Sequence, residues 1–474
     1  MSGHQEETMP YRDIRQFIAR LDAAGELLEI DAEVDPHEEL GAICRKVLDE
    51  GGPALMFNNV KGYQYPVFTN MLGTKDRIAL AMDVALAEVG ETFLKRSRGR
   101  PWPQPRMVTS APCKEVVIPE AQLRIEDLVP RAVNNPDDGG AFLNYGLVVM
   151  KDPDSGRRNM GIYRLQLRPG NRTGIWSSPT SHAGTIRTKN DLRGAPTEVA
   201  VAIGGDPMLY LASQVQGLNL GDDEMELASS LRGEPVELVK CDTVDLEVPA
   251  DAEIVLEGRI LPGVREAEGP YGEYPGYYGP VGEQPVIQFH HATRRKSPVY
   301  VHTYIGVPPS DTHALGQMMG EAGLTAKLRN DVAPTVKEVY CALDMHTVVV
   351  SLKKTYDEQA KHVIYALWST RTAKTVIVVD DDIDPRNQEE VYWAIANRSH
   401  APRDVVMGDG FGTIGPAIDK YGDGIASKLG IDATAPLKGY PAMSRPRPEM
   451  AARVRERWAE LTASQKTKLR RGRG

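Results

Sequence analysis

The 474-residue sequence has little of what marks several large classes of protein. Its four cysteines lie far apart and form no C-x-x-C pair: Cys44, Cys113, Cys241 and Cys341. This spacing suggests neither a zinc ribbon nor a disulfide framework, and it is typical of buried free thiols. No run of 18 apolar residues and no signal-peptide core occur. We therefore expect a cytoplasmic protein without a membrane span.

An excess of positive charge is also missing, since 65 acidic residues outnumber 56 basic ones and the formal charge is -9. Nucleic-acid binding needs a basic face that neutralises phosphates, so we expect no nucleic-acid partner. The basic cluster at residues 466–473 is more typical of a helix end than of a polyanion site. No internal repeat or low-complexity block is visible, and the composition is that of a globular protein.

The first 115 residues read as a small α/β domain. Apolar residues recur at i, i+3, i+4 and i+7 from Ile14 to Leu21, which predicts a helix. Further patterns predict a strand at 27–30, a helix after Pro36, strands at 54–60 and 65–72, and a helix over 75–95. A proline-broken stretch at 100–105 precedes the end of this domain.

The sequence pattern changes between residues 116 and 308, where short β-like runs alternate with turn residues. The runs lie at 142–150, 160–167, 199–203, 236–241, 254–260, 286–291 and 299–305. Such spacing without long helices predicts an antiparallel barrel or sandwich.

Residues 309–440 alternate in type. We expect strands at 347–352, 375–380 and 404–407 and helices at 356–370 and 387–396, a pattern that favours a parallel, doubly wound sheet. The tail, 441–474, contains a predicted amphipathic helix over 447–469. We interpret this helix as an oligomerisation element.

The stretch with the most candidate catalytic side chains is the loop from Arg265 to Tyr278. It mixes charged side chains with glycines, prolines and four tyrosines, a composition typical of a shaped, ordered loop. Glu268 and Glu273 are five residues apart, and a turn between them would aim both carboxyl groups into one cleft. Two carboxyls in one cleft cannot both ionise cheaply, so one acquires a raised pKa and becomes a proton donor. The alternative is an acidic surface loop.

A second stretch of this kind runs from Asn159 to Gly184. A strand through 161–167 would place Asn159 and Arg164 on opposite faces, unless a bulge or a ligand at the strand end joins them. The guanidinium of Arg164 can clamp a substrate carboxylate with two hydrogen bonds. An internal salt bridge to the loop glutamates is the alternative, and composition does not separate the two.

His182 and Glu224 add further ligand types to Asn159. Nitrogen and oxygen ligands of this kind suit Mn²⁺ or Mg²⁺ better than a structural zinc. Glu224 is expected at a helix N-terminus, where a negative charge is favoured. An isolated histidine such as His182 is also common as a surface or hydrogen-bonded core residue.

A different chemistry is suggested by G-x-G-x-x-G at residues 410–415, which is the pattern of a dinucleotide site. Pro416 follows at once, and no clear acidic strand residue lies about 20 positions on. A nicotinamide-dependent oxidoreductase is therefore an alternative. Paired carboxylates alone would also allow a glycosidase.

Several ordered motifs together resemble the UbiD family of reversible (de)carboxylases. They are N-x-G-I-Y-R at 159–164, S-H at 181–182, E-x-x-L-A-x-x-L-R-G-E-P at 224–235, E-G-P-Y-G-E at 268–273 and D-D-D-I-D-P at 380–385. The resemblance runs to about Ala435. It implies a multidomain α+β fold with an N-terminal α/β domain, a central split β-barrel that binds prenylated FMN, and a C-terminal α/β domain. The terminal helix would cross to a partner subunit in a homodimer or dimer-based hexamer.

The resemblance also implies roles for individual residues. Arg164, Glu268 and Glu273 match the catalytic network, in which Arg164 holds the substrate carboxylate, Glu268 supports it and Glu273 protonates the carbon. The implied metal ligands are Asn159, His182 and Glu224. The implied cofactor contacts are Asn159, Gly161, Ile162, Tyr163, Arg164, Ser181, His182, Glu224 and Lys374, with a K⁺ site near Ala212 and Ser213. This chain departs from some members at 178–181, where it reads S-P-T-S.

The implied reaction releases CO₂ from an aromatic acid, with the carbanion chemistry supplied by the cofactor. A flavin prenyltransferase would supply that cofactor. The tyrosine-rich rim of Tyr271, Tyr274, Tyr277 and Tyr278 suits a flat acid. A hydroxybenzoate-type acid is expected first, and a pyrrole, furan, indole or phenazine carboxylate next. A non-catalytic assembly subunit of the same fold is a further alternative.

Overall fold

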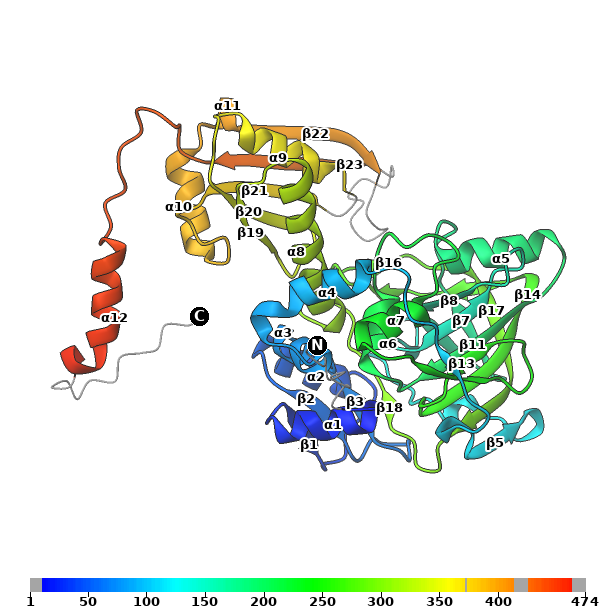
Figure 1. Ribbon diagram of the computed structural model, residues 1–474. Coiled ribbons are helices and arrows are strands. Elements are labelled where there is room, and N and C mark those ends of the chain that lie inside the picture. The colour runs from blue at the N-terminus through cyan, green and yellow to red at the C-terminus, as the bar shows by residue number, and fades with distance from the viewer. Residues whose placement is uncertain (1–10, 371–372, 413–424, 463–474) are drawn as a thin grey trace, which may run out of the picture.

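The computed structural model describes residues 11–370, 373–412 and 425–462. It shows a multidomain α+β protein in which three sheet-containing regions follow one another along the chain (Figure 1). The fold class expected from the sequence is confirmed. One helix, α12 (Pro448–Thr462), stands apart from these regions at the end of an extended segment (Figure 1).

The N-terminal region begins with the predicted helix. Asp13 caps it by accepting a hydrogen bond from the Gln16 amide, and Ile14, Phe17 and Leu21 are buried along one face. Its elements are α1 (Ile14–Ala23), β1 (Leu27–Ile30), α2 (Glu39–Asp49), β2 (Ala54–Phe57), β3 (Val67–Thr69), α3 (Lys75–Met82) and α4 (Val89–Arg98). The single helix predicted over 75–95 is wrong, because Asp83 adopts a left-handed conformation, φ 54°, and ends α3.

The N-terminal sheet is completed by a strand from much later in the chain. Its order is β1-β2-β3-β18, and β18 (Tyr300–Val301) pairs in parallel with β3. Tyr300 and Val301 are fully buried there. The run at 299–305 was predicted as part of the central barrel, and this prediction is wrong because the chain returns to the first sheet before it enters the C-terminal region.

The central region is built on one nine-stranded sheet in which every pairing is antiparallel, as the spacing of short strands predicts. Its strands are β5 (Val116–Pro119), β6 (Phe142–Leu143), β7 (Leu147–Lys151), β8 (Arg158–Ile162), β9 (Leu165–Arg168), β10 (Arg172–Ile175), β11 (Thr197–Ile203), β14 (Ile254–Glu268) and β17 (Gly282–Arg294). The order β6-β9-β10-β17-β14-β11-β7-β8 places β8 at one edge and β9 next to the other. Because only two residues join β8 to β9, the sheet must curl until its edges approach each other.

The continuous strand predicted over 161–167 is wrong for the same reason. β8 ends at Ile162 and β9 begins at Leu165, so Tyr163 and Arg164 form a corner between the two edges of the sheet. The strict alternation that would separate Asn159 from Arg164 does not continue through such a corner.

Three helices interrupt the central strands, and the sequence indicated only the start of one of them, at Glu224. They are α5 (His182–Leu192), α6 (Pro207–Ser213) and α7 (Glu224–Arg232). Nearly all side chains of α6 and α7 are buried, so these helices lack the polar face that makes a helix visible in a sequence. The small strands β4 (Arg106–Met107), β12 (Glu237–Lys240) and β13 (Glu247–Pro249) form a separate three-stranded sheet.

The C-terminal sheet has the order β19-β20-β21-β23-β22. The prediction of a parallel, doubly wound sheet is only partly right, because β20, β21 and β23 run parallel whereas both edge strands run antiparallel. The strands are β19 (Val336–Cys341), β20 (Thr347–Leu352), β21 (Thr375–Asp380), β22 (Val405–Gly412) and β23 (Ile425–Ala433), and the helices are α9 (Gln359–Trp368), α10 (Gln388–Arg398) and α11 (Ala401–Asp404). Gly410 and Gly412 lie within β22, whereas Gly415 lies outside the described residues, as does the basic cluster at 466–473.

Helix α8 (Asp311–Asp331) connects the regions. It packs against α3 and α4 of the N-terminal region and against β19 and α9 of the C-terminal region (Figure 1). None of the helices in the described ranges has the length and apolarity needed to cross a bilayer.

A buried carboxylate joins the N-terminal helix to the central sheet. Glu253 is fully buried and accepts hydrogen bonds from Arg15 Nε at 2.8 Å, from Arg15 Nη2 at 2.7 Å and from the Val299 amide at 3.0 Å. Arg295 Nε lies 3.3 Å from the same carboxylate. Removing a buried partner of this kind leaves charged groups without compensation.

We therefore expect Glu253→Ala to lower the Tm by about 5–10 °C in scanning calorimetry. The matched control is Glu460→Ala on α12, which removes an exposed partner of Arg457 and should leave the Tm unchanged. Equal shifts in the two variants would contradict the anchoring role of Glu253.

Candidate active site

The corner between β8 and β9 places Arg164 beside the end of β14. Arg164 Nε and Nη2 each lie 3.0 Å from one carboxylate oxygen of Glu268, which gives a bidentate pair. The two side chains are 8% and 1% exposed. A guanidinium and a carboxylate in this geometry fix each other's orientation as well as their charges.

The third member of the group comes from the loop that follows β14. Glu273 lies between β15 (Tyr271–Gly272) and β16 (Tyr278–Gly279), and Arg164 Nη1 donates a hydrogen bond to its Oε1. The turn is closed by the Gly276 amide, 2.8 Å from the Glu273 carbonyl, and by the Glu273 amide, 2.9 Å from the Tyr277 carbonyl. The ordered loop expected from the composition is therefore a small hairpin that carries Glu273.

The electrostatics of Glu273 differ from those of an exposed acid. Burial raises the pKa of Glu273, the positive charge of Arg164 opposes this rise, and the nearby charge of Glu268 adds to it. The net direction is upward, so Glu273 keeps a proton to higher pH than an exposed glutamate does. Burial opposes the charged form of Arg164, yet the two carboxylates outweigh it and raise its pKa, which keeps the guanidinium charged.

Aromatic rings pack on both sides of the guanidinium. The Arg164 Cζ atom lies 4.7 Å from the ring centre of Tyr271 and 5.1 Å from that of Trp176. Tyr271 is buried, and its hydroxyl donates to Asn144 Oδ1 at 3.0 Å. The predicted tyrosine rim is therefore wrong for Tyr271, which lies beneath Arg164, whereas Tyr277 and Tyr278 are exposed.

Asn159, His182 and Glu224, which are distant in the sequence, also lie together. Asn159 lies on β8, His182 opens α5 and Glu224 opens α7, as its predicted helix N-terminal position requires. Asn159 Nδ2 is 2.9 Å from Glu224 Oε1 and 3.5 Å from His182 Nδ1, and the Met160 amide donates to Glu224 Oε2 at 2.8 Å. Two helix N-termini thus meet at one strand, an arrangement that attracts negative charge.

The donor atoms of this group fit a divalent cation. Asn159 Oδ1 is buried and has no hydrogen-bond partner among the residues that the structure describes. A buried acceptor without a partner is rare in proteins and needs an explanation. A carboxylate, an imidazole and an amide oxygen are suitable ligands for Mn²⁺ or Mg²⁺.

Glycines allow close packing around the same group. A side-chain carbon on Gly161 would lie 2.7 Å from the Tyr163 ring, and one on Gly184 would lie 2.1 Å from the Ser178 carbonyl oxygen. Ser181 caps α5 by accepting from the Gly184 amide at 3.1 Å. The turn at 178–181, where this chain departs from some relatives of similar motif, therefore packs tightly against the start of α5.

The remaining predicted residues lie further out. Ala212 is buried and Ser213 half-buried at the end of α6, and the Ser213 hydroxyl donates to the Tyr210 carbonyl at 2.8 Å. Lys374 precedes β21, and its amide donates to the His346 carbonyl at 2.9 Å. The His346 ring lies 5.8 Å from the ring of Tyr274, which belongs to the hairpin of β15 and β16. Lys374 is therefore linked to this hairpin only indirectly, through His346.

Sequence reasoning missed Trp176 and Asn144. Trp176 follows β10, and its amide lies 3.4 Å from the Arg164 carbonyl, so the two residues face each other across the β9–β10 hairpin. The short turn between β9 and β10 was the sequence signal that could have placed Trp176 opposite Arg164. Asn144 had none, because its contact with Tyr271 joins residues 127 positions apart.

A separate cluster of Asp242, Glu257 and His291 also has the composition of a metal site, with ligand atoms within 4.8 Å of one another. Its members already have partners. Glu257 accepts from the amides of Asp242 and Thr243 and from the Thr243 hydroxyl, and Lys114 pairs with Asp242. We interpret this cluster as an internal ion network.

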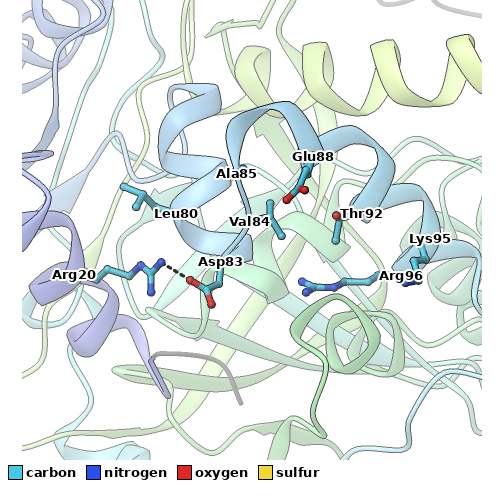
Figure 2. A pocket seen from close by; sticks show the side chains of 9 residues that line it. All are labelled: Arg20, Leu80, Asp83, Val84, Ala85, Glu88, Thr92, Lys95 and Arg96. Atoms are coloured by element: carbon cyan, nitrogen blue, oxygen red, sulfur yellow. Dashed lines mark hydrogen bonds and ion pairs between the residues drawn. The ribbon is translucent and has the colours of Figure 1, made fainter. Parts of the chain in front are cut away.

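A hollow of about 480 Å³ lies in the N-terminal region and shares no residue with either group (Figure 2). Two of its arginines have structural partners: Arg20 bonds to Asp83, as Figure 2 shows, and Arg96 bonds to the carbonyls of Met82 and Leu231. We therefore place the candidate active site at Arg164.

Comparison with known proteins shows to which family the chain is similar. Models of the three domains of 3-octaprenyl-4-hydroxybenzoate carboxy-lyase match the chain: the N-terminal domain at residues 18–97, the Rift-related domain at 106–308 and the C-terminal domain at 313–433. A protein of Archaeoglobus fulgidus described as uncharacterized is 36% identical over 451 residues, which cover 90% of this chain and 92% of that protein.

Two kinds of solved structure are also similar. The UbiD-class enzyme HmfF of Pelotomaculum thermopropionicum, in complex with FMN, is 38% identical, with a TM-score of 0.84 and coverage of 93% of this chain and 98% of that one. An evolved dimeric form of HmfF in complex with prFMN has a TM-score of 0.81, 38% identity and coverage of 92% and 97%. The vanillic acid decarboxylase of Sedimentibacter hydroxybenzoicus in open form, with a truncated ShVdcD chain, is 30% identical, with a TM-score of 0.84 and coverage of 96% and 100%.

The close packing at the start of α5 can be tested by substitution. In Gly184→Ala, the added methyl group would meet the Ser178 carbonyl, so we expect a Tm lower by about 5 °C or more. The matched control is Gly323→Ala within α8, where the added carbon has nothing within 4 Å and alanine favours the helix. That control should not lower the Tm, and a similar loss in both variants would refute the packing argument.

Proposed function

The chain belongs to the UbiD family of carboxy-lyases, and on this premise we propose that it is a reversible, non-oxidative decarboxylase of an aromatic or heteroaromatic acid. The observation that carries the proposal is the buried guanidinium of Arg164 held between Glu268 and Glu273. Such a group offers a fixed cation for a carboxylate and a proton donor beside it.

Arg164 binds and orients the substrate carboxylate in this proposal. Its two bonds to Glu268 fix the plane of the guanidinium, and the rings of Tyr271 and Trp176 restrict its tilt. The Nη1 group, which contacts Glu273, is left as the position that can exchange partners when a carboxylate arrives. Glu268 thus acts through Arg164 and does not itself need to touch the substrate.

Glu273 delivers the proton. Burial raises its pKa, so it keeps a proton to higher pH than an exposed glutamate does, and its position next to Arg164 places the proton beside the bound carboxylate. After CO₂ leaves, Glu273 protonates the carbon that carried it. In the reverse direction the same carboxylate removes a proton from that carbon.

The residues around Asn159 would hold prenylated FMN, which is bound in the HmfF structure described above. When bound, this cofactor supplies an electron sink for the carbon that loses CO₂. Asn159, His182 and Glu224 would hold Mn²⁺ or Mg²⁺ at its phosphate, with Gly161, Ile162, Tyr163, Ser181 and Lys374 as further contacts. We place K⁺ near Ala212 and Ser213.

The substrate class follows from the surroundings of Arg164. The rings of Trp176 and Tyr271 lie close to the guanidinium and make the adjoining surface suitable for a planar acid. The vanillic acid decarboxylase is 30% identical, which favours a hydroxybenzoate-type acid. Pyrrole, furan, indole and phenazine carboxylates fit the same description. A flavin prenyltransferase is the partner that we expect to supply the cofactor.

The alternatives have less support. Gly410 and Gly412 lie inside β22, which pairs antiparallel with β23, so they do not form the turn of a dinucleotide site. A non-catalytic subunit would have no need to keep all of Arg164, Glu268 and Glu273 in contact.

We also propose a homodimer or dimer-based hexamer in which α12 packs on a second copy. Its four large apolar residues are each at least 38% exposed: Met450, Val454, Trp458 and Leu461. An apolar face of this kind on a helix that stands apart from the rest of the chain needs a partner (Figure 1).

The role of Glu273 predicts the effect of Glu273→Gln. The amide keeps the shape but cannot donate the required proton, so kcat should fall at least about 10²-fold while bound cofactor, read from absorbance, is unchanged. The matched control is Glu266→Gln, which changes a glutamate partner of Arg172 on β14, the strand that precedes the hairpin. Release of ¹⁴CO₂ from a panel of carboxyl-labelled aromatic acids measures both, and full activity of Glu273→Gln would remove Glu273 from the mechanism.

The metal role predicts a different effect of His182→Ala. Loss of one ligand should lower bound Mn²⁺ about 10- to 100-fold at limiting metal and reduce cofactor retention. Elemental analysis and cofactor absorbance measure this, with His362→Ala on the exposed face of α9 as control. Unchanged occupancy in His182→Ala would refute the ligand role.

A further inference from the structure

The hairpin that carries Glu273, formed by β15 and β16, is held at its two strands by residues 137–139 of the central region. The Gly272 amide donates to Asp138 Oδ1 at 2.8 Å, the Gly139 amide donates to the Pro270 carbonyl at 2.7 Å, and the Asp137 amide donates to the Tyr278 hydroxyl at 3.0 Å. These bonds hold the base of the hairpin. The turn that carries Glu273 lies beyond them.

The turn itself is held by the first turn of α8. His313 is fully buried, its Nε2 lies 2.7 Å from the Tyr274 carbonyl, and its Nδ1 lies 2.7 Å from the Ser310 hydroxyl. A carbonyl can only accept, so Nε2 carries the proton and Nδ1 accepts from Ser310. Burial lowers the pKa of His313 to about 4, which keeps the ring neutral and the donor direction constant.

The same helix turn is tied to the other regions. Asp311 accepts from the Leu72 amide at 2.5 Å and from the Thr303 hydroxyl at 2.9 Å, and further along the helix α8 packs against β19 and α9. The His346 ring of the C-terminal region lies 5.8 Å from the Tyr274 ring. Tyr274, the residue that follows Glu273, is therefore contacted by both α8 and the C-terminal region.

We propose that His313 is a positioning residue. Its hydrogen bond to the Tyr274 carbonyl holds the Glu273 carboxylate next to the Arg164 guanidinium, and it makes the position of Glu273 depend on the placement of α8. The inference rests on the proposed function of Glu273. His313 does not need to contact the substrate in this role. A displacement of Glu273 by about 1 Å would be enough to slow proton transfer by up to about 100-fold.

Two amide substitutions separate this contact from packing. In His313→Gln the amide nitrogen reaches the place of Nε2 and can donate to Tyr274, whereas in His313→Asn it reaches only the place of Nδ1, next to Ser310. Hydrogen exchange of peptides covering residues 269–279 in the full chain reports the hairpin directly. Turnover of the cofactor-loaded enzyme reports kcat and KM.

We expect His313→Asn to speed exchange at 273–277 and to lower kcat about 10- to 100-fold with little change in KM. His313→Gln should restore both to within about threefold of wild type. Equal behaviour of the two variants, in exchange and in kcat, would overturn the proposal. If His313→Asn fails to fold, His313→Leu serves instead, because leucine fills the buried space but cannot donate to the Tyr274 carbonyl, and unchanged exchange and kcat in that variant would overturn the proposal.

The two readouts also keep this inference apart from the proposed function. If the wild-type enzyme releases no CO₂ from any acid in the panel, the proposed function fails, while exchange still tests the His313 contact. If wild type is active and exchange is unaffected in His313→Asn, only the positioning role fails.

Discussion

The bidentate contact between Arg164 and Glu268 is the interaction on which the rest of the structure depends. A guanidinium that is 8% exposed is costly to bury unless a carboxylate meets it with good geometry. Arg164 lies at the corner after β8, whereas Glu268 ends β14, and in a flat sheet these positions would lie far apart. The curl that brings the edges of the nine-stranded sheet together is thus also what gives this charge its partner.

The two glutamates contact the same guanidinium but are not equivalent. Glu268 uses both oxygens and is 1% exposed, whereas Glu273 uses one oxygen, is 17% exposed and lies on a hairpin turn. Glu268 therefore has the geometry of a fixed counter-ion to Arg164, whereas Glu273, whose pKa is raised by burial, has that of a group that can exchange a proton.

Local patterns in the sequence were sufficient where the determinants are local. The apolar stripe from Ile14 to Leu21 predicted α1, and the alternation around residues 347–380 predicted β20, α9 and β21. They failed where long-range pairing decides, as for β18, which joins a strand more than 200 residues away, and for α6, whose side chains are nearly all buried. In the site, residue types and motif order indicated Arg164 and the glutamates, whereas Trp176 and His313 act through contacts that no local pattern encodes.

The two groups of the candidate site share one short segment. Asn159 and Arg164 are five residues apart, so their Cα atoms are separated by no more than about 17 Å. At one end, two helix N-termini and a buried amide oxygen without a partner among the described residues offer a place for a cation and a phosphate. At the other end lie a charged guanidinium and an acid with a raised pKa. A single elongated phosphate-bearing cofactor along this segment would contact both ends. Two unrelated ligands would not explain why Asn159 and Arg164 lie so close together in the chain. The short separation therefore favours one composite site.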